Sequence, residues 1–223
     1  MREFSSCSCH DFGLIFPARW SAPPYPIPFL LSVLKMSTKW GLLDGREHAI
    51  HYLEQPDANF PKLLKFHASV KYNIPQWVRP TFDILVSTDW EMGYLLTLSG
   101  YDLCPNLIDL VIKTRDIVGR EQRRLATIPP PVEHHFGCRG HTRRERCESA
   151  WVFTWVLNIG RQIVHVDPLF RLESYKAVDA IQALVVPGMS EGCLALTKEK
   201  VLEGDAFDYI YKVCTAALAQ IGM

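Results

Sequence analysis

Histidine and cysteine residues crowd one short stretch of the sequence, HHFGCRGHTRRERC, at residues 134–147. Thiolate sulfur and imidazole nitrogen are ligands that zinc prefers in proteins, and four of them complete a tetrahedral shell. The stretch supplies such a set, which we take as candidate zinc ligands: His135, Cys138, His141 and Cys147, with His134 as an alternative to His135. Their spacing matches no known zinc finger, so a zinc site is one of three interpretations.

Four arginines, Arg139, Arg143, Arg144 and Arg146, lie between these candidate ligands. Positive charge lowers the pKa of a neighbouring thiol and favours the thiolate that binds metal, but it also repels a dication until the thiolates have formed. The second interpretation is therefore a basic loop that contacts a partner. The third, which we favour, is an exposed polar connector between two groups of helices, with no cofactor bound.

Two further patterns resemble catalytic motifs. GMSEG at 188–192 has the Gly-x-Ser-x-Gly spacing of a hydrolase nucleophile elbow, but no histidine follows His165, and that triad needs one after the serine. HVDP at 165–168 places a histidine near Asp167, which suits a helix cap because a proline follows it. We expect a turn between helices at 188–192 and no enzymatic activity.

The composition is that of an ordinary globular protein. The 223 residues are 48% hydrophobic, and 24 basic side chains balance 24 acidic ones, so no overall charge attracts nucleic acid or anionic membranes. Seven scattered cysteines favour reduced thiols in an intracellular protein, cytoplasmic or nuclear. The longest strongly apolar segment, residues 151–159, is shorter than the roughly 18 residues that a spanning helix needs. We therefore expect no membrane span.

Helical spacing of apolar residues dominates the chain, and few segments alternate with a period of two, so we predict an all-α, bundle-like fold. The pattern divides the chain into an irregular or disordered segment (1–28), a helical region (29–127), a Pro/Arg-rich connector (128–146) and a second helical region (147–223). Residues 107–125 carry one apolar stripe and predict a long helix that ends before the prolines at 129–131.

Several details of these helices are also predicted. Asp44 is a candidate helix cap, Pro80 should bend its helix, and the last helix should begin near Asp205. Trp151 and Trp155 lie one turn apart and suit packing rather than cofactor binding. The expected buried stripes of the second region are Val152, Val156, Ile159 and Ile163 in one helix, and Leu172, Val178, Ile181 and Leu184 in the next.

Four segments, SVLKMSTKWGLLDGREHAIHYL, KYNIPQWVRPTFDIL, GRQIVHVDPL and GMSEGCL, in this order and spacing, resemble the fungal family of BTB/POZ-domain proteins. The similarity extends over roughly 29–223 and implies that the first segment corresponds to the closing helices of a BTB fold. Residues 1–28 stand where such a domain would open with a sheet, so the chain resembles a truncated member. Leu30, Leu34 and Trp40 should then be exposed.

The resemblance implies a non-enzymatic scaffold or adaptor that binds other proteins, without specifying the partner or an oligomeric state. The alternative is a nucleic-acid or zinc-associated regulatory protein that acts through residues 134–147 together with the arginines at 120–124. Nucleic-acid binding is the less expected of the two, because charges along a helix usually form a solvated face.

Overall fold

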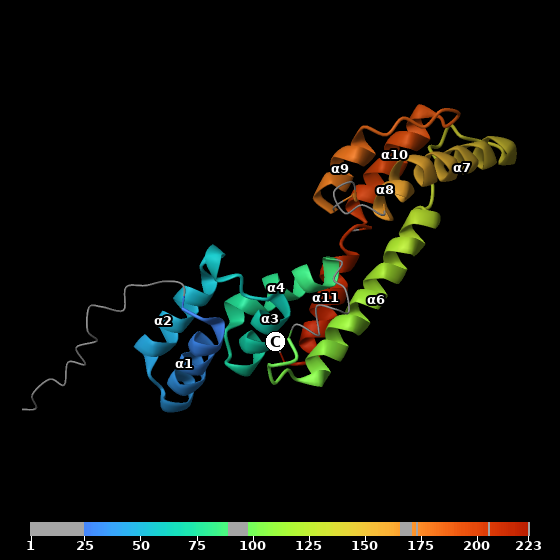
Figure 1. The fold of residues 1–223 in the computed structure, drawn as a ribbon. Coiled ribbons are helices and arrows are strands. Elements are labelled where there is room, and N and C mark those ends of the chain that lie inside the picture. Colours follow the sequence, from blue (N-terminus) through green and yellow to red (C-terminus); the bar gives the residue numbers. More distant parts are fainter. Residues whose placement is uncertain (1–24, 89–97, 166–170, 173, 205, 223) are drawn as a thin grey trace, which may run out of the picture. The chain divides into compact units, whose positions relative to one another are not determined.

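A computed structural model of the protein describes residues 25–88, 98–165, 171–172, 174–204 and 206–222 (Figure 1). Regular structure in these residues is helical throughout, with no strand, which confirms the all-α prediction. None of the helices described is long and apolar enough to cross a membrane. The chain divides into two units, residues 1–60 and 61–223. The predicted irregular segment 1–28 lies mostly outside the described residues, and the first helix begins at Ile27.

The first unit contains a pair of helices, α1 (Ile27–Trp40) and α2 (Leu43–Glu54), which pack against each other. Gly41 joins them with a φ of 67°, a left-handed conformation that glycine adopts without strain. Leu30 and Leu34 are buried, so the prediction that they are exposed is wrong, whereas Trp40 is 65% exposed as predicted. Asp44 lies in the first turn of α2 but makes no side-chain cap bond there.

The second unit begins with a core built from α3 (Lys62–Lys71), α4 (Pro75–Ser87), α6 (Pro105–Thr127) and α11 (Tyr209–Ala219). Pro80 lies inside α4, and Phe66 and Phe82 pack together with ring centroids 5.1 Å apart. The apolar stripe of α6 is buried as predicted, through Leu107, Val111, Val118 and Leu125. The last helix begins at Tyr209; the expected cap, Asp205, lies outside the described residues.

A second core in this unit surrounds two tryptophans. It is built from the end of α6, from α7 (His141–Trp155) with the π turn η2 (Val156–Gly160) and α8 (Arg161–Ile163), and from α9 (Ser174–Gln182) and α10 (Glu191–Glu203). Trp155 donates its indole N–H to the carbonyl of Leu125 at 2.8 Å. Gly160 approaches α6 so closely that a Cβ there would lie 2.2 Å from the carbonyl oxygen of Ala126. The glycine therefore allows the π turn to pack on α6.

Two predicted stripes are right only in part: Ile159 and Ile163 of the first and Ile181 and Leu184 of the second are buried as predicted, but each stripe also includes an exposed valine. Val152 is 44% exposed, because Trp151 and Trp155 take the core-facing positions of α7 and the π turn then rotates the following residues. On α9, Val178 is exposed while Ala177 and Ile181 are buried. The turn predicted at 188–192 is confirmed: Gly188 has a φ of 88°, and the hydroxyl of Ser190 accepts a bond from the backbone N–H of Cys193 at the start of α10.

Candidate metal centre

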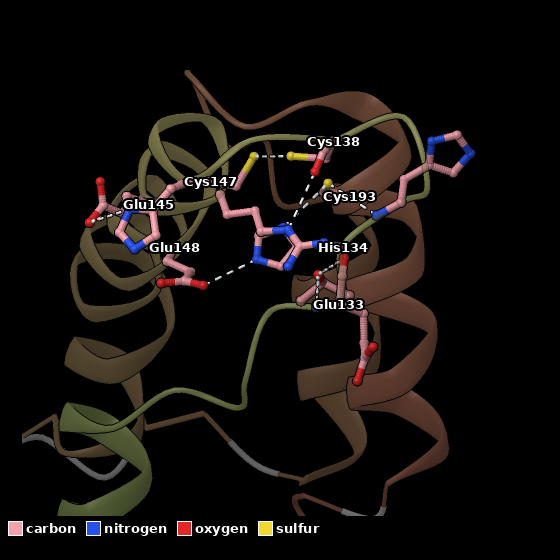
Figure 2. A network of polar contacts seen from close by, with 11 residues as sticks. Glu133, His134, Cys138, Glu145, Cys147, Glu148 and Cys193 are labelled. Atoms are coloured by element: carbon pink, nitrogen blue, oxygen red, sulfur yellow. Dashed lines mark hydrogen bonds and ion pairs between the residues drawn. The ribbon is translucent and has the colours of Figure 1, made fainter.

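Four side chains of the second core, His134, Cys138, Cys147 and Cys193, bring one potential ligand atom each to a single point. These atoms all lie within 4.8 Å of one another, and the three cysteines are buried. Figure 2 shows the group between the ribbons of α7 and α10, with the connector that carries His134 and Cys138 running between them. Residues from three separate parts of the second unit therefore meet here.

The connector between α6 and α7 is held against both helices by hydrogen bonds. Trp151 of α7 donates its indole N–H to the carbonyl of Pro130 at 2.8 Å. On the α10 side, the backbone N–H of Glu133 donates to the hydroxyl of Thr197 at 3.0 Å. These bonds fix an extended segment that has no helical ladder of its own, and so they fix the direction in which His134 points.

Each cysteine is oriented by its own local structure. Cys138 closes a turn in which its backbone N–H donates to the carbonyl of His135 at 2.8 Å. Cys147 is buried in the second turn of α7. The sequence suggested that this helix begins at Cys147, but it begins at His141. Cys193 lies in the first turn of α10, where Ser190 is the N-cap. Two of the three sulfurs are thus held by helices.

The distances between ligand atoms suit tetrahedral zinc. With Zn–S bonds of about 2.3 Å and a Zn–N bond of about 2.0 Å, two sulfurs in a tetrahedral shell lie about 3.8 Å apart and a sulfur and a nitrogen about 3.5 Å apart. In the protein the sulfurs of Cys138 and Cys147 are 4.0 Å apart, and the sulfur of Cys193 is 3.8 Å from Nδ1 of His134. A zinc ion can therefore be bound with only small movements, whereas sulfurs this far apart form no disulfide.

The second nitrogen of His134 has a carboxylate partner. Its Nε2 lies 3.1 Å from Oε1 of Glu148 on α7, so the N–H at this position donates to the carboxylate and Nδ1 keeps the lone pair that faces the sulfurs. Metal-binding histidines usually donate their other N–H in this way, which fixes the tautomer and makes the ligand nitrogen more basic. The contact with Glu148 therefore supports a metal site independently of the close approach of the four ligand atoms.

Hydrogen bonds also prepare one thiol for metal binding. Burial alone would raise the pKa of Cys193, but opposing hydrogen bonds, above all those with Ser190 and the backbone N–H of His135, lower that pKa to about 7. Burial, together with Cys193 and Cys147, raises the pKa of Cys138 to about 11. Without metal, Cys193 therefore loses its proton before Cys138, and a bound dication favours the thiolate form of the cysteines that bind it.

Only some of the candidate ligands proposed from the sequence meet in the structure. His134, Cys138 and Cys147 come together, but His135 and His141 do not join them. The ring of His135 packs on Phe136, with centroids 4.0 Å apart, and its Nδ1 accepts the backbone N–H of Gly137. The side chain of His141 is 87% exposed and pairs with Glu145.

Cys193 is the ligand that the sequence did not reveal. It follows the GMSEG turn, which attracted attention only as a hydrolase motif, and it lies far along the chain from the His/Cys-rich stretch. Its position directly after a capped helix start is a usable signal, since helix N-termini lower thiol pKa values.

Comparison of the chain with protein-family models, curated proteins and solved structures gave no match. The chemistry of the site therefore rests on its own geometry. Three sulfurs and one nitrogen within 4.8 Å of one another, with a carboxylate behind the nitrogen, are suited to holding zinc.

Proposed function

We propose that the protein is a non-enzymatic helical interaction protein whose second unit is stabilised by a structural zinc ion bound to His134, Cys138, Cys147 and Cys193. The observation that carries the proposal is the convergence of their four ligand atoms within 4.8 Å. Glu148, behind His134, supports it as the outer partner of a metal-bound imidazole.

The ligand set favours a structural role over a catalytic one. Catalytic zinc sites keep a coordination position open for water or substrate, whereas structural sites fill all four positions with protein side chains, mostly cysteines. Three buried cysteines and one histidine leave no such position here. The ion would polarise no substrate, and its contribution is to the folded state.

Zinc at this point would connect segments that are distant in the sequence. The connector supplies His134 and Cys138, α7 supplies Cys147 and α10 supplies Cys193. Bringing residues 134 and 193 together on folding costs conformational entropy. Metal–ligand bonds offset this cost, because the four ligands meet only in the folded state. The metal would thus anchor a connector that has no helical structure of its own.

Exposed apolar side chains support the interaction part of the proposal. Phe136 in the zinc-binding connector is 80% exposed, and Phe153 on α7 is 68% exposed. The arginines of α6 support nucleic-acid binding less well, because Arg120 and Arg124 pair with acidic residues of the same helix. The resemblance to fungal BTB proteins agrees with a protein-binding role and stays a prediction.

Metal analysis of purified, tag-free protein tests the zinc assignment. The wild type should carry one zinc per chain, and His134→Ala should reduce zinc retention, whereas His141→Ala should retain the wild-type amount because His141 lies outside the cluster. Equal retention by both variants would contradict the ligand assignment.

The interaction role has a separate test. Affinity capture from a cell extract, with wild type and Phe153→Ser compared side by side, should yield a protein that binds only the wild type. Identical captured sets would argue against this surface.

A further inference from the structure

A pocket of about 510 Å³ lies beside the proposed zinc centre, entirely within the second unit. The connector, α7 and the start of α10 form its walls, and Cys138 and Cys147 are part of them. Arg143 and Arg146 also line it, together with His135 and Ser190, and no carboxylate does. The pocket is therefore a concave site whose charged side chains are basic.

The two arginines of this pocket differ from others nearby in having no partner. Among the described residues, neither Arg143 nor Arg146 makes an ion pair or a hydrogen bond. Arg144, by contrast, donates to the carbonyl of Cys138, and Arg139 donates to the carbonyl of Phe136. Arg143 and Arg146, three residues apart on one helix, thus both line the pocket, and both are exposed.

The charges of the zinc centre do not make this pocket negative. Three thiolates around one zinc ion carry a single net negative charge, and the two guanidinium groups exceed it by one positive charge. The carboxylate of Glu148, behind His134, balances this excess, so the centre and its two arginines together are close to neutral and do not repel an anion.

We propose that this pocket binds the phosphate of a phosphorylated serine or threonine side chain on a partner protein. The planar fork of arginine matches phosphate oxygens two at a time, and paired arginines are the usual receptors for a phosphate dianion in proteins. The inference rests on the proposed function, because zinc fixes the two cysteines that form part of the wall.

The form of the site favours a phosphopeptide over nucleic acid. A duplex presents a row of phosphates and is bound by an extended basic surface, whereas here two arginines converge on one pocket. Phe136, exposed in the same connector, offers an apolar contact of the kind that a peptide side chain would use. A phosphate group flanked by polypeptide fits both features.

The test is titration of isotope-labelled, zinc-loaded protein with inorganic phosphate, O-phosphoserine, serine and a short DNA duplex, followed through the Nε–H signals of the arginines. Phosphate and O-phosphoserine should each shift the Arg143 and Arg146 signals in a saturable way, and serine should not. Arg143→Gln with Arg146→Gln should weaken binding of both anions at least tenfold. The control, Lys113→Gln with Arg120→Gln on α6, changes the net charge equally and should bind like the wild type.

Each other outcome overturns the inference. Shifts that do not saturate, or that persist in the Arg143/Arg146 double variant, would show that phosphate binds nonspecifically. Duplex binding that is tighter than O-phosphoserine and depends on the same arginines would assign the pocket to nucleic acid. Zinc content is measured in every sample: a zinc-loaded protein that ignores phosphate refutes the pocket alone, whereas a protein without zinc refutes the proposed function.

Discussion

Replacing Glu148 by alanine should weaken zinc binding although Glu148 itself does not touch the metal. Its carboxylate accepts the Nε2–H of His134 at 3.1 Å and so orients the ring and makes Nδ1 a better ligand. Loss of such an outer partner typically weakens metal affinity about 10–100-fold, or about 1.4–2.7 kcal/mol. The Glu148 side chain is 57% exposed, and solvent screens its charge, so we expect a value near the lower end, about tenfold.

The matched control is Glu145→Ala. Glu145 lies on the same helix, also pairs with a histidine, and its removal changes the net charge by the same amount, but its partner His141 is outside the cluster. Competition for zinc against a colorimetric chelator gives the affinity of each variant. We expect a roughly tenfold loss for Glu148→Ala and wild-type affinity for Glu145→Ala. Equal affinities for the two variants would refute the assignment of His134 as a ligand through Nδ1.

Three further predictions concern other parts of the second unit. Cys193→Ser should lose tight zinc binding and the stabilisation that zinc gives against heat. Cys214→Ser, at an equally buried cysteine in α11, should keep both. The same zinc content in the two variants would exclude Cys193 as a ligand. Gly160→Ala should lower the free energy of unfolding by about 1–3 kcal/mol because its Cβ would overlap the carbonyl oxygen of Ala126. Gly119→Ala in α6, where the Cβ would meet only the side chain of Arg123 at ordinary contact distance, should raise it by about 0.5–1 kcal/mol. Denaturant unfolding that ranks the two variants the other way would contradict the packing of the π turn. Burial first, and then Lys71, lowers the pKa of His67, so the unfolded chain takes up a proton at this residue more readily and the free energy of unfolding falls as the pH drops below about 6.5. His67→Gln should remove this part of the pH dependence. If urea unfolding between pH 7 and 5 shows the same change in the free energy of unfolding for wild type and variant, the prediction is wrong.

Helices were predictable from the sequence where an apolar stripe runs over many residues. The stripe of α6 is the best example, since proline residues follow its C-terminal end and leave little choice of boundary. In α7 the same reasoning was wrong for Val152, because two tryptophans outweigh it in the area they bury and a π turn breaks the periodicity that follows.

The metal site was only partly predictable, for physical reasons. His134 and His135 are neighbours in an extended segment, so which of them faces the cysteines depends on bonds to Thr197 and Cys193 that only the fold supplies. His141 was a reasonable candidate until α7 was found to begin at that residue with its side chain in solvent. Cys193 was missed because spacing reveals local ligands and this one is brought in by tertiary packing; only its place near a helix start indicated a thiol suited to metal binding.

The most direct measurement is zinc K-edge X-ray absorption on the purified protein, with the zinc content determined on the same sample. We expect one zinc per chain, bound by three sulfurs at about 2.3 Å and one nitrogen at about 2.0 Å. A protein that holds no zinc, or a metal shell made mostly of oxygen and nitrogen, would contradict it.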